Sequence, residues 1–228
     1  MKTRPVVALV LFGLLGAVAP SKLLAWQAPT HDYARWEKEI AAMEATDRDH
    51  PPAKGGIVFV GSSTIRLWKT LAEDYPDRDV INRGFGGSEV TDSTYFADRL
   101  VFPHEPKQIV FRAGGNDINA GRLPREVAAD FAEFVALIRT RLPRTEILFI
   151  GWNPSIARWG QTDKLREMNR LVREAALEMP HVGYIDAVDF VLGENGLPRP
   201  ELFAPDGLHF SPEGYKLLAE IVRPYLRK

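Results

Sequence analysis

The sequence predicts an α/β protein in which one parallel sheet is covered by helices on both faces. Five short apolar runs alternate with amphipathic stretches along the chain, which is the order expected of successive βαβ units. The first run, Ile57-Val58-Phe59-Val60, contains no polar residue, as expected of a strand that is buried on both faces. Such sheets bind their ligands beyond the carboxyl ends of the strands.

Apolar residues at three- and four-residue spacing mark the helices. The first is expected at residues 32–49, before Pro51-Pro52. The cap Ser211, followed by Pro212, begins a last helix that runs to about residue 225. Residues 193–205 form the longest loop. The other strands are expected at residues 80–81, 109–111, 147–150 and 182–185, and the other helices at 65–71, 89–100, 124–142 and 161–178.

The N-terminus has the pattern of a signal peptide. Lys2 and Arg4 precede an apolar run over residues 6–19, which is too short for a comfortable membrane span. The candidate cleavage sites follow Ala19 and Ala25, and an uncleaved anchor is the alternative. All of these interpretations predict export, to the periplasm or beyond the cell.

The organisation that follows has three parts. Residues 1–25 are interpreted as the signal peptide, residues 26–55 as an N-terminal helix and linker packed on the domain, and residues 56–228 as the main domain. The length of 228 residues suits a single domain after removal of a leader.

Composition excludes several kinds of chemistry. The net charge is −1 and the basic residues are scattered, so no nucleic-acid partner is expected. The chain has no cysteine, which excludes disulfides, thiolate catalysis and cysteine-ligated zinc. It also lacks His-x-x-x-His and His-Glu-x-x-His, so no metal site is expected.

The most informative motif is Asp206-Gly207-Leu208-His209. An acid and an imidazole three positions apart on a turn can form the proton-handling pair of a hydrolytic triad. A nucleophile for this pair is offered by Gly61-Ser62-Ser63-Thr64, which directly follows the first strand. Backbone N–H groups at the following helix N-terminus can stabilise an oxyanion. The alternative is a Ser/Thr helix cap.

Two further motifs follow the second and third strands. The glycine-rich residues 82–88 let backbone approach a ligand, with a flexible turn as the alternative. Gly114-Gly115-Asn116-Asp117 supplies the Asn116 carboxamide as an oxyanion donor, with an Asn/Asp turn as the alternative. These groups converge at one sheet edge, which favours a hydrolase site. The absence of a Gly-x-Ser-x-Gly elbow argues against the ordinary α/β-hydrolase.

With these motifs the chain resembles the SGNH/GDSL hydrolase family of esterases and lipases, from about residue 57 to the C-terminus. Gly61-Ser62-Ser63-Thr64 is similar to the family's Gly-Asp-Ser-Leu block, which makes Ser63 the nucleophile. Ser62 stands where the family has Asp, so the choice between the two serines stays open. Gly87 matches the oxyanion glycine, although Gly84 and Gly86 allow other registers.

The resemblance implies a flavodoxin-like three-layer α/β/α sandwich with a five-stranded parallel sheet and no cofactor, over residues 56–228. It implies a triad of Ser63, His209 and Asp206. The oxyanion hole is then formed by the backbone N–H groups of Ser63 and Gly87 and the side chain of Asn116. The expected reaction is hydrolysis of a carboxylic ester through an acyl-enzyme.

Candidate substrate-binding residues are Trp68, which follows Ser63 by one to two helical turns, and Arg158 and Trp159, which follow the fourth strand. Packing over the core is the alternative for the tryptophans. Arg83 and Arg112 are candidates for binding an anionic substrate group or for structural salt bridges.

The pattern favours a small-molecule or carbohydrate ester as the partner, with a short acyl group such as acetyl. No stable membrane insertion is expected after removal of the leader, and the oligomeric state stays open. Lipase or lysophospholipase activity, acyl transfer on the same site, and an inactive carbohydrate-binding protein are the alternatives.

Overall fold

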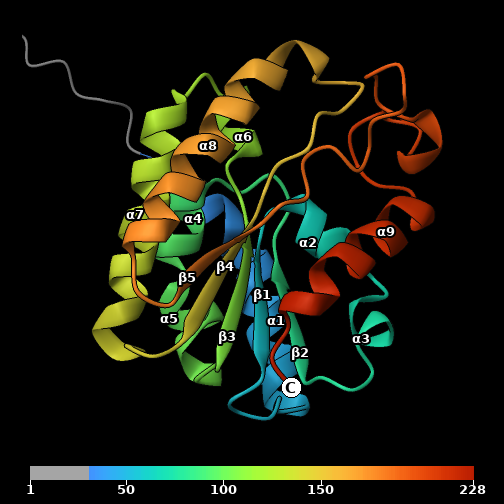
Figure 1. Cartoon of the computed structure of the whole chain (residues 1–228). Coiled ribbons are helices and arrows are strands. Elements are labelled where there is room, and N and C mark those ends of the chain that lie inside the picture. The colour runs from blue at the N-terminus through green and yellow to red at the C-terminus, as the bar shows by residue number, and fades with distance from the viewer. Residues whose placement is uncertain (1–30) are drawn as a thin grey trace, which may run out of the picture. The chain divides into compact units, whose positions relative to one another are not determined.

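The computed structural model of the chain describes residues 31–228, so the predicted signal peptide lies outside the described residues. A sheet of five strands forms the centre (Figure 1). Its order is β2-β1-β3-β4-β5 and every neighbouring pair is parallel. The strands are β1 (Ile57–Gly61), β2 (Val80–Gly84), β3 (Gln108–Arg112), β4 (Glu146–Ile150) and β5 (Val182–Ile185).

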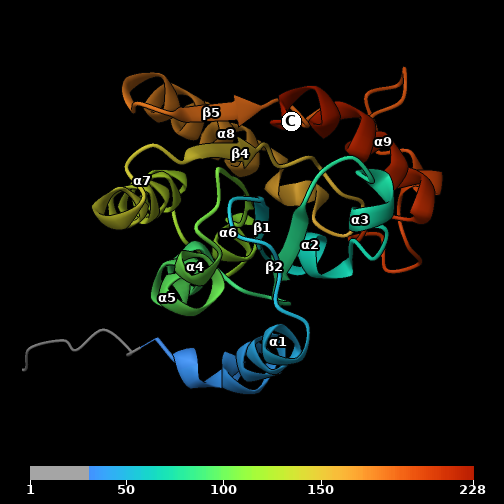
Figure 2. The same cartoon turned by 90° about the horizontal axis from the view of Figure 1, so that it is seen from below.

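Helices cover both faces of the sheet, which confirms the predicted three-layer α/β/α sandwich (Figure 2). On one face lie α1 (Glu37–Asp49), α4 (Val90–Tyr95), α5 (Ala97–Leu100), α7 (Pro124–Arg141) and α8 (Thr162–Glu178). On the other lie α2 (Ser63–Leu67), α3 (Leu71–Asp74) and α9 (Pro212–Val222). The short α6 (Gly115–Asn119) follows β3, and 3₁₀ turns span η1 (Tyr33–Trp36), η2 (Phe102–His104), η3 (Trp159–Gln161), η4 (Pro200–Leu202) and η5 (Arg223–Tyr225).

The apolar runs of the strands supply both cores because successive side chains of a strand point to opposite faces. Val58 and Val60 belong to the cluster beneath α4, α7 and α8, whereas Ile57 and Phe59 belong to the cluster beneath α2 and α9. All four side chains are fully buried. An unbroken apolar run is therefore what this central strand requires.

Most of the predicted elements are present, and three differ. The stretch at 65–71 is two short helices, α2 and α3, and the stretch at 89–100 is likewise divided into α4 and α5. The helix α6, which was not among the predicted helices, covers the motif for which an Asn/Asp turn was the alternative interpretation. The Ser211 cap is confirmed, because its Oγ accepts a hydrogen bond from the Gly214 N–H at 3.2 Å.

The described part of the N-terminal region contains η1 and α1, and Ile40 of α1 is buried in the core cluster beside α5. The domain boundaries predicted at residues 25 and 55 stay predictions. The parallel strands all end at one edge, where Gly61 pairs with Gly84 on one side and with Arg112 on the other. The loops that leave this edge carry the candidate site.

Candidate active site

A hydroxyl, an imidazole and a carboxylate from distant parts of the chain meet at the carboxyl edge of the sheet. Ser63 is the first residue of α2, directly after β1, and its Oγ lies 2.9 Å from Nε2 of His209. Nδ1 of His209 lies 2.6 Å from Oδ2 of Asp206. The two contacts form a continuous chain in which a proton can pass from the hydroxyl to the imidazole.

The turn at Asp206 fixes the carboxylate. Gly207 adopts φ +64°, a left-handed conformation that glycine tolerates without strain. Oδ1 of Asp206 accepts hydrogen bonds from the N–H groups of Leu208 and His209 at 2.9 and 3.0 Å. The bond to the His209 ring and these backbone bonds lower the pKa of Asp206 to about 2. The carboxylate therefore remains ionised at neutral pH.

The structure distinguishes the two adjacent serines. Ser62 is fully buried, and its Oγ has no hydrogen-bond partner among the described residues. It occupies the N-cap position of α2 but makes no side-chain capping bond. Ser63 is partly exposed and contacts the imidazole. Ser63 is thus the hydroxyl that faces the site.

The sharp turn before Ser63 depends on Gly61. A Cβ at Gly61, where φ is +148°, would lie 2.1 Å from the carbonyl oxygen of Arg112 on the neighbouring strand. The tight approach lets α2 begin at the sheet edge with the Ser63 N–H at its first position. In the next loop Gly87 has φ +76°, and the ring of Trp36 lies 3.3 Å from the position of a Cβ there. Trp36, which the sequence did not indicate, therefore flanks this loop.

The Asn116 carboxamide is oriented from both ends. Its Nδ2 donates to the carbonyl of Ser88 at 3.0 Å, and its Oδ1 accepts from Arg158 at 3.2 Å. Arg158 also donates to the carbonyl of Gly115 at 3.3 Å. One N–H of Nδ2 is thereby left for another acceptor. The structure brings Asn116 and the Gly87–Ser88 turn together, as the shared sheet edge predicts.

Asp117 is a residue that sequence reasoning missed. It is fully buried, and its Oδ1 accepts a hydrogen bond from the Val90 N–H at the start of α4 at 3.1 Å. Burial raises its pKa to about 7. Its position directly after Asn116 in the motif was the available signal. Asp117 therefore connects α6 to the start of α4.

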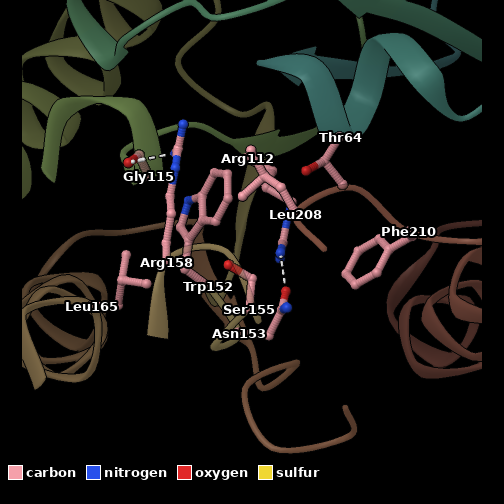
Figure 3. Close-up of a pocket in the computed structure, with 10 residues that line it drawn as sticks. All are labelled: Thr64, Arg112, Gly115, Trp152, Asn153, Ser155, Arg158, Leu165, Leu208 and Phe210. Atoms are coloured by element: carbon pink, nitrogen blue, oxygen red, sulfur yellow. Dashed lines mark hydrogen bonds between the residues drawn. The ribbon is translucent and has the colours of Figure 1, made fainter. Parts of the chain in front are cut away.

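A small cavity of about 20 Å³ adjoins the site (Figure 3). Thr64, Gly115 and Leu208 line it, and each is the chain neighbour of Ser63, Asn116 or His209. Arg112 and Arg158 line it as well, together with Trp152, Asn153, Ser155, Leu165 and Phe210.

The predicted substrate-binding residues have different fates. The prediction for Trp68 is wrong, because its side chain is only 1% exposed and packs against Phe59, Tyr75 and Tyr215. Its Nε1 donates to Asp74 at 2.6 Å. An apolar ring this close to β1 is used by the core, not by the site.

Arg158 lines the cavity, whereas Trp159 is 40% exposed on η3. Arg83 forms a salt bridge with Asp47, which is the structural one of its two interpretations. Arg112 has no carboxylate within 4 Å among the described residues.

Within residues 31–228, three or more His, Asp or Glu side chains do not gather in any group suited to a metal ion. No helix in the same part of the chain is long and apolar enough to cross a membrane.

The parallel sandwich and the hydroxyl, imidazole and carboxylate at its edge define the class of the protein as an α/β/α hydrolase. The chain belongs to the GDSL-like Lipase/Acylhydrolase family, whose sequence profile matches residues 58–217. It is accordingly a carboxylic ester hydrolase.

Among curated relatives, the chain is 26% identical over 194 residues to human platelet-activating factor acetylhydrolase IB subunit alpha1, covering 79% of this chain and 78% of the relative. Several solved structures share its fold. A protein from Streptococcus pneumoniae, described as a proposed platelet activating factor, has a TM-score of 0.76 at 20% identity, with 86% and 94% of the two chains covered. A mutant acetylxylan esterase from Geobacillus stearothermophilus has a TM-score of 0.59 at 18% identity, with 77% and 98% covered.

Proposed function

We propose that the protein is an exported serine esterase that removes short acyl groups, acetyl among them, from small or carbohydrate esters. The observation that carries the catalytic part is the 2.9 Å contact between Ser63 Oγ and His209 Nε2, continued to Asp206. A hydroxyl bonded to an imidazole that is itself held by a carboxylate is activated for attack on a carbonyl. This contact favours catalysis over the inactive binding protein.

In the proposed reaction His209 takes the proton of Ser63 as Oγ attacks the ester carbonyl. Asp206, which stays ionised because of its lowered pKa, holds the ring and stabilises the imidazolium. The N–H groups of Ser63 and Gly87 and the Nδ2 of Asn116 bind the oxyanion. His209 then protonates the leaving alcohol, and water releases the acyl group from Ser63.

The oxyanion assignment is supported by the available donors. Neither the Ser63 N–H nor the Gly87 N–H has a hydrogen-bond partner among the described residues. Asn116 donates to Ser88 with one of its two N–H groups, and the bond from Arg158 fixes the orientation of the amide. Three donors then converge from three loops at the sheet edge.

The short acyl group is supported by the small size of the cavity between Thr64, Gly115 and Leu208. Two of the proteins compared above, an acetylhydrolase and an acetylxylan esterase, are named for removing acetyl groups. The leaving alcohol would occupy the larger cavity of about 410 Å³ beside His209, which is lined by Leu67 and Tyr215 among others. That volume accommodates a sugar ring.

The experiment compares Ser63→Ala with Ser62→Ala. The wild type should hydrolyse p-nitrophenyl acetate and react with a fluorophosphonate probe, and Ser63→Ala should lose both reactions. Ser62→Ala serves as the matched control and should keep both. Loss of labelling in Ser62→Ala alone would reverse the assignment.

Chain length and alcohol are tested separately, with p-nitrophenyl esters from acetate to palmitate and with acetylated xylan. We expect the highest kcat/KM for acetate and release of acetate from the polysaccharide. A preference for palmitate would contradict the short-acyl proposal and favour the lipase alternative.

Export is proposed from Lys2, Arg4 and the apolar residues 6–19. Expression of the full chain in a bacterium, cell fractionation and mass spectrometry of the N-terminus test it. We expect an exported protein that begins after Ala19 or Ala25, or an intact chain in the membrane fraction. Intact protein in the cytosol would contradict the proposal.

A further inference from the structure

Arg112 is a buried cation that faces no buried anion. The residue ends β3 at the sheet edge that carries the site, and its side chain is 1% exposed. Its guanidinium donates to the carbonyl of Gly151 and to Oδ1 of Asn153, both of them neutral acceptors. The group lies 4.5 Å from the ring of Trp152 and 5.8 Å from that of Phe210 (Figure 3). Burial lowers its pKa to about 10, so it is still protonated at neutral pH.

Arg83 shows how this protein treats the same side chain elsewhere. It is 7% exposed at the end of the neighbouring strand β2, and both carboxylate oxygens of Asp47 accept its hydrogen bonds at 2.5 and 2.6 Å. Buried arginines are almost always paired in this way, because an uncompensated charge is costly to desolvate. Arg112 departs from that rule, and its Nε has no partner among the described residues.

A second cation lines the same cavity. Arg158 is part-buried, and its acceptors are the carbonyl of Gly115 and the amide oxygen of Asn116, which are neutral. No carboxylate lies within 4 Å of Arg158 among the residues that the structure describes. The cavity of about 20 Å³ therefore has two positive charges on its walls and no negative one to balance them.

The cavity adjoins the proposed catalytic residues, and its assignment to the acyl group rests on that proximity. Thr64, Gly115 and Leu208 on its walls are the neighbours of the proposed nucleophile, amide donor and base. It is too small for an alcohol as large as a sugar, for which the cavity of about 410 Å³ lined by His209 has room.

We propose that this cavity is a carboxylate-binding subsite for the acyl side of the ester. Half-esters of short dicarboxylic acids are then better substrates than neutral esters of the same size. The inference rests on the proposed serine esterase function and adds the charge of its acyl group. A guanidinium fork suits a carboxylate because two parallel N–H groups can bind its two oxygens.

The carboxylate takes no part in the bond changes. Ser63 Oγ forms an ester bond with the acyl carbon, the bond to the alcohol oxygen breaks, and His209 returns the proton to that oxygen. Water then cleaves the acyl-enzyme and yields the free dicarboxylic acid and the original serine.

The test uses two substrates that differ in one group, monoethyl succinate and ethyl succinamate, with release of ethanol as the readout. The first carries a carboxylate and the second an isosteric neutral amide. We expect kcat/KM at least about tenfold higher for the carboxylate, because its hydrogen bonds to the buried Arg112 guanidinium are charge-assisted. The malonate pair, one carbon shorter, measures the reach of the subsite.

Arg112→Gln should reduce this ratio to within about threefold of unity. Arg66→Gln is the matched control, since Arg66 lies on α2 near Ser63 but does not line the cavity and faces Glu39 at 3.8 Å. It should keep the wild-type ratio. Thermal unfolding checks that each variant is folded. If Arg112→Gln does not fold, the ratio of the two kcat/KM values in the wild type decides whether the subsite prefers a carboxylate.

Equal kcat/KM for the two succinyl esters, or a preference that survives Arg112→Gln, would overturn the proposal. The proposal would also be overturned if the enzyme preferred the charged substrate only in the pair acetoxyacetate and acetoxyacetamide. In acetoxyacetate the carboxylate is on the alcohol side of the ester. Hydrolysis of p-nitrophenyl acetate that depends on Ser63 would leave the esterase function intact in each of these cases.

Discussion

Replacing Asp117 by Asn should make the protein less sensitive to pH. The folded state holds this carboxyl with a pKa of about 7, whereas an unfolded chain gives about 3.9. Between these values the folded state binds the proton more tightly, so the free energy of unfolding of the wild type falls as pH rises. The effect is complete only above pH 7, when the buried group has ionised.

The two pKa values give the magnitude. The raised pKa of Asp117 disfavours the folded state, relative to the unfolded chain, by roughly 1.5 kcal/mol at pH 5 and by roughly 4 kcal/mol at pH 8. The difference between these two conditions, roughly 2.5 kcal/mol, should disappear in Asp117→Asn. The new side chain keeps an oxygen to accept the hydrogen bond from Val90, so the link between α4 and α6 is retained.

The assay is urea unfolding of the wild type and Asp117→Asn at pH 5 and pH 8. Other titrating groups contribute equally to both proteins and cancel in the comparison. Asp98→Asn, at a side chain that is 73% exposed, is the control and should shift both conditions alike. If the effect of Asp117→Asn on the free energy of unfolding is the same at both pH values within about 0.5 kcal/mol, the reasoning fails.

Three further outcomes test the site. Asn116→Ala should lower kcat for p-nitrophenyl acetate by roughly 10²–10³ with little change in KM, because the donor acts on the oxyanion and not on the bound ester; a change confined to KM would contradict this. Asp206→Asn should lower kcat by roughly 10⁴ through the wrong tautomer of His209, and a loss below tenfold in steady-state kinetics would argue against the relay. Trp68→Phe should lower the free energy of unfolding by about 2 kcal/mol in urea titration, because the hydrogen bond to Asp74 is lost. Its kcat should stay within about twofold of wild type. A large fall in kcat would indicate that Trp68 contributes to the active site.

The fold could be predicted because its signals are local. Each strand is an apolar run, and the helix α9 begins with a cap and a proline that can be seen in the sequence. The splitting of residues 89–100 into α4 and α5 could not be seen in this way. It occurs at Phe96, which caps both helices and is buried in the core, and that burial is a tertiary contact.

The site could be predicted for those residues whose position is set by the end of a strand. Ser63, Asn116 and the Gly87 turn follow three strands, so topology alone brings them to one edge. Which of the two serines faces that edge depends on the turn at Gly61, where the close approach of β3 sets the direction of each side chain. The burial of Ser62 and the exposure of Ser63 follow from that turn, and no residue type in the motif indicates it.

The roles of Arg83 and Arg112 could not be distinguished from the sequence alone. The two residues occupy equivalent places, each at the end of a strand beside β1, and their sequences offer the same two interpretations. What separates them is a carboxylate 36 positions away in the chain: Asp47 of α1 reaches Arg83, and no acid reaches Arg112 among the described residues. A buried cation is structural when the fold supplies its counter-charge. At Arg112, where the described residues supply none, the proposed subsite takes the balancing charge from the substrate, and the charge of the acyl group becomes a property that the enzyme can select.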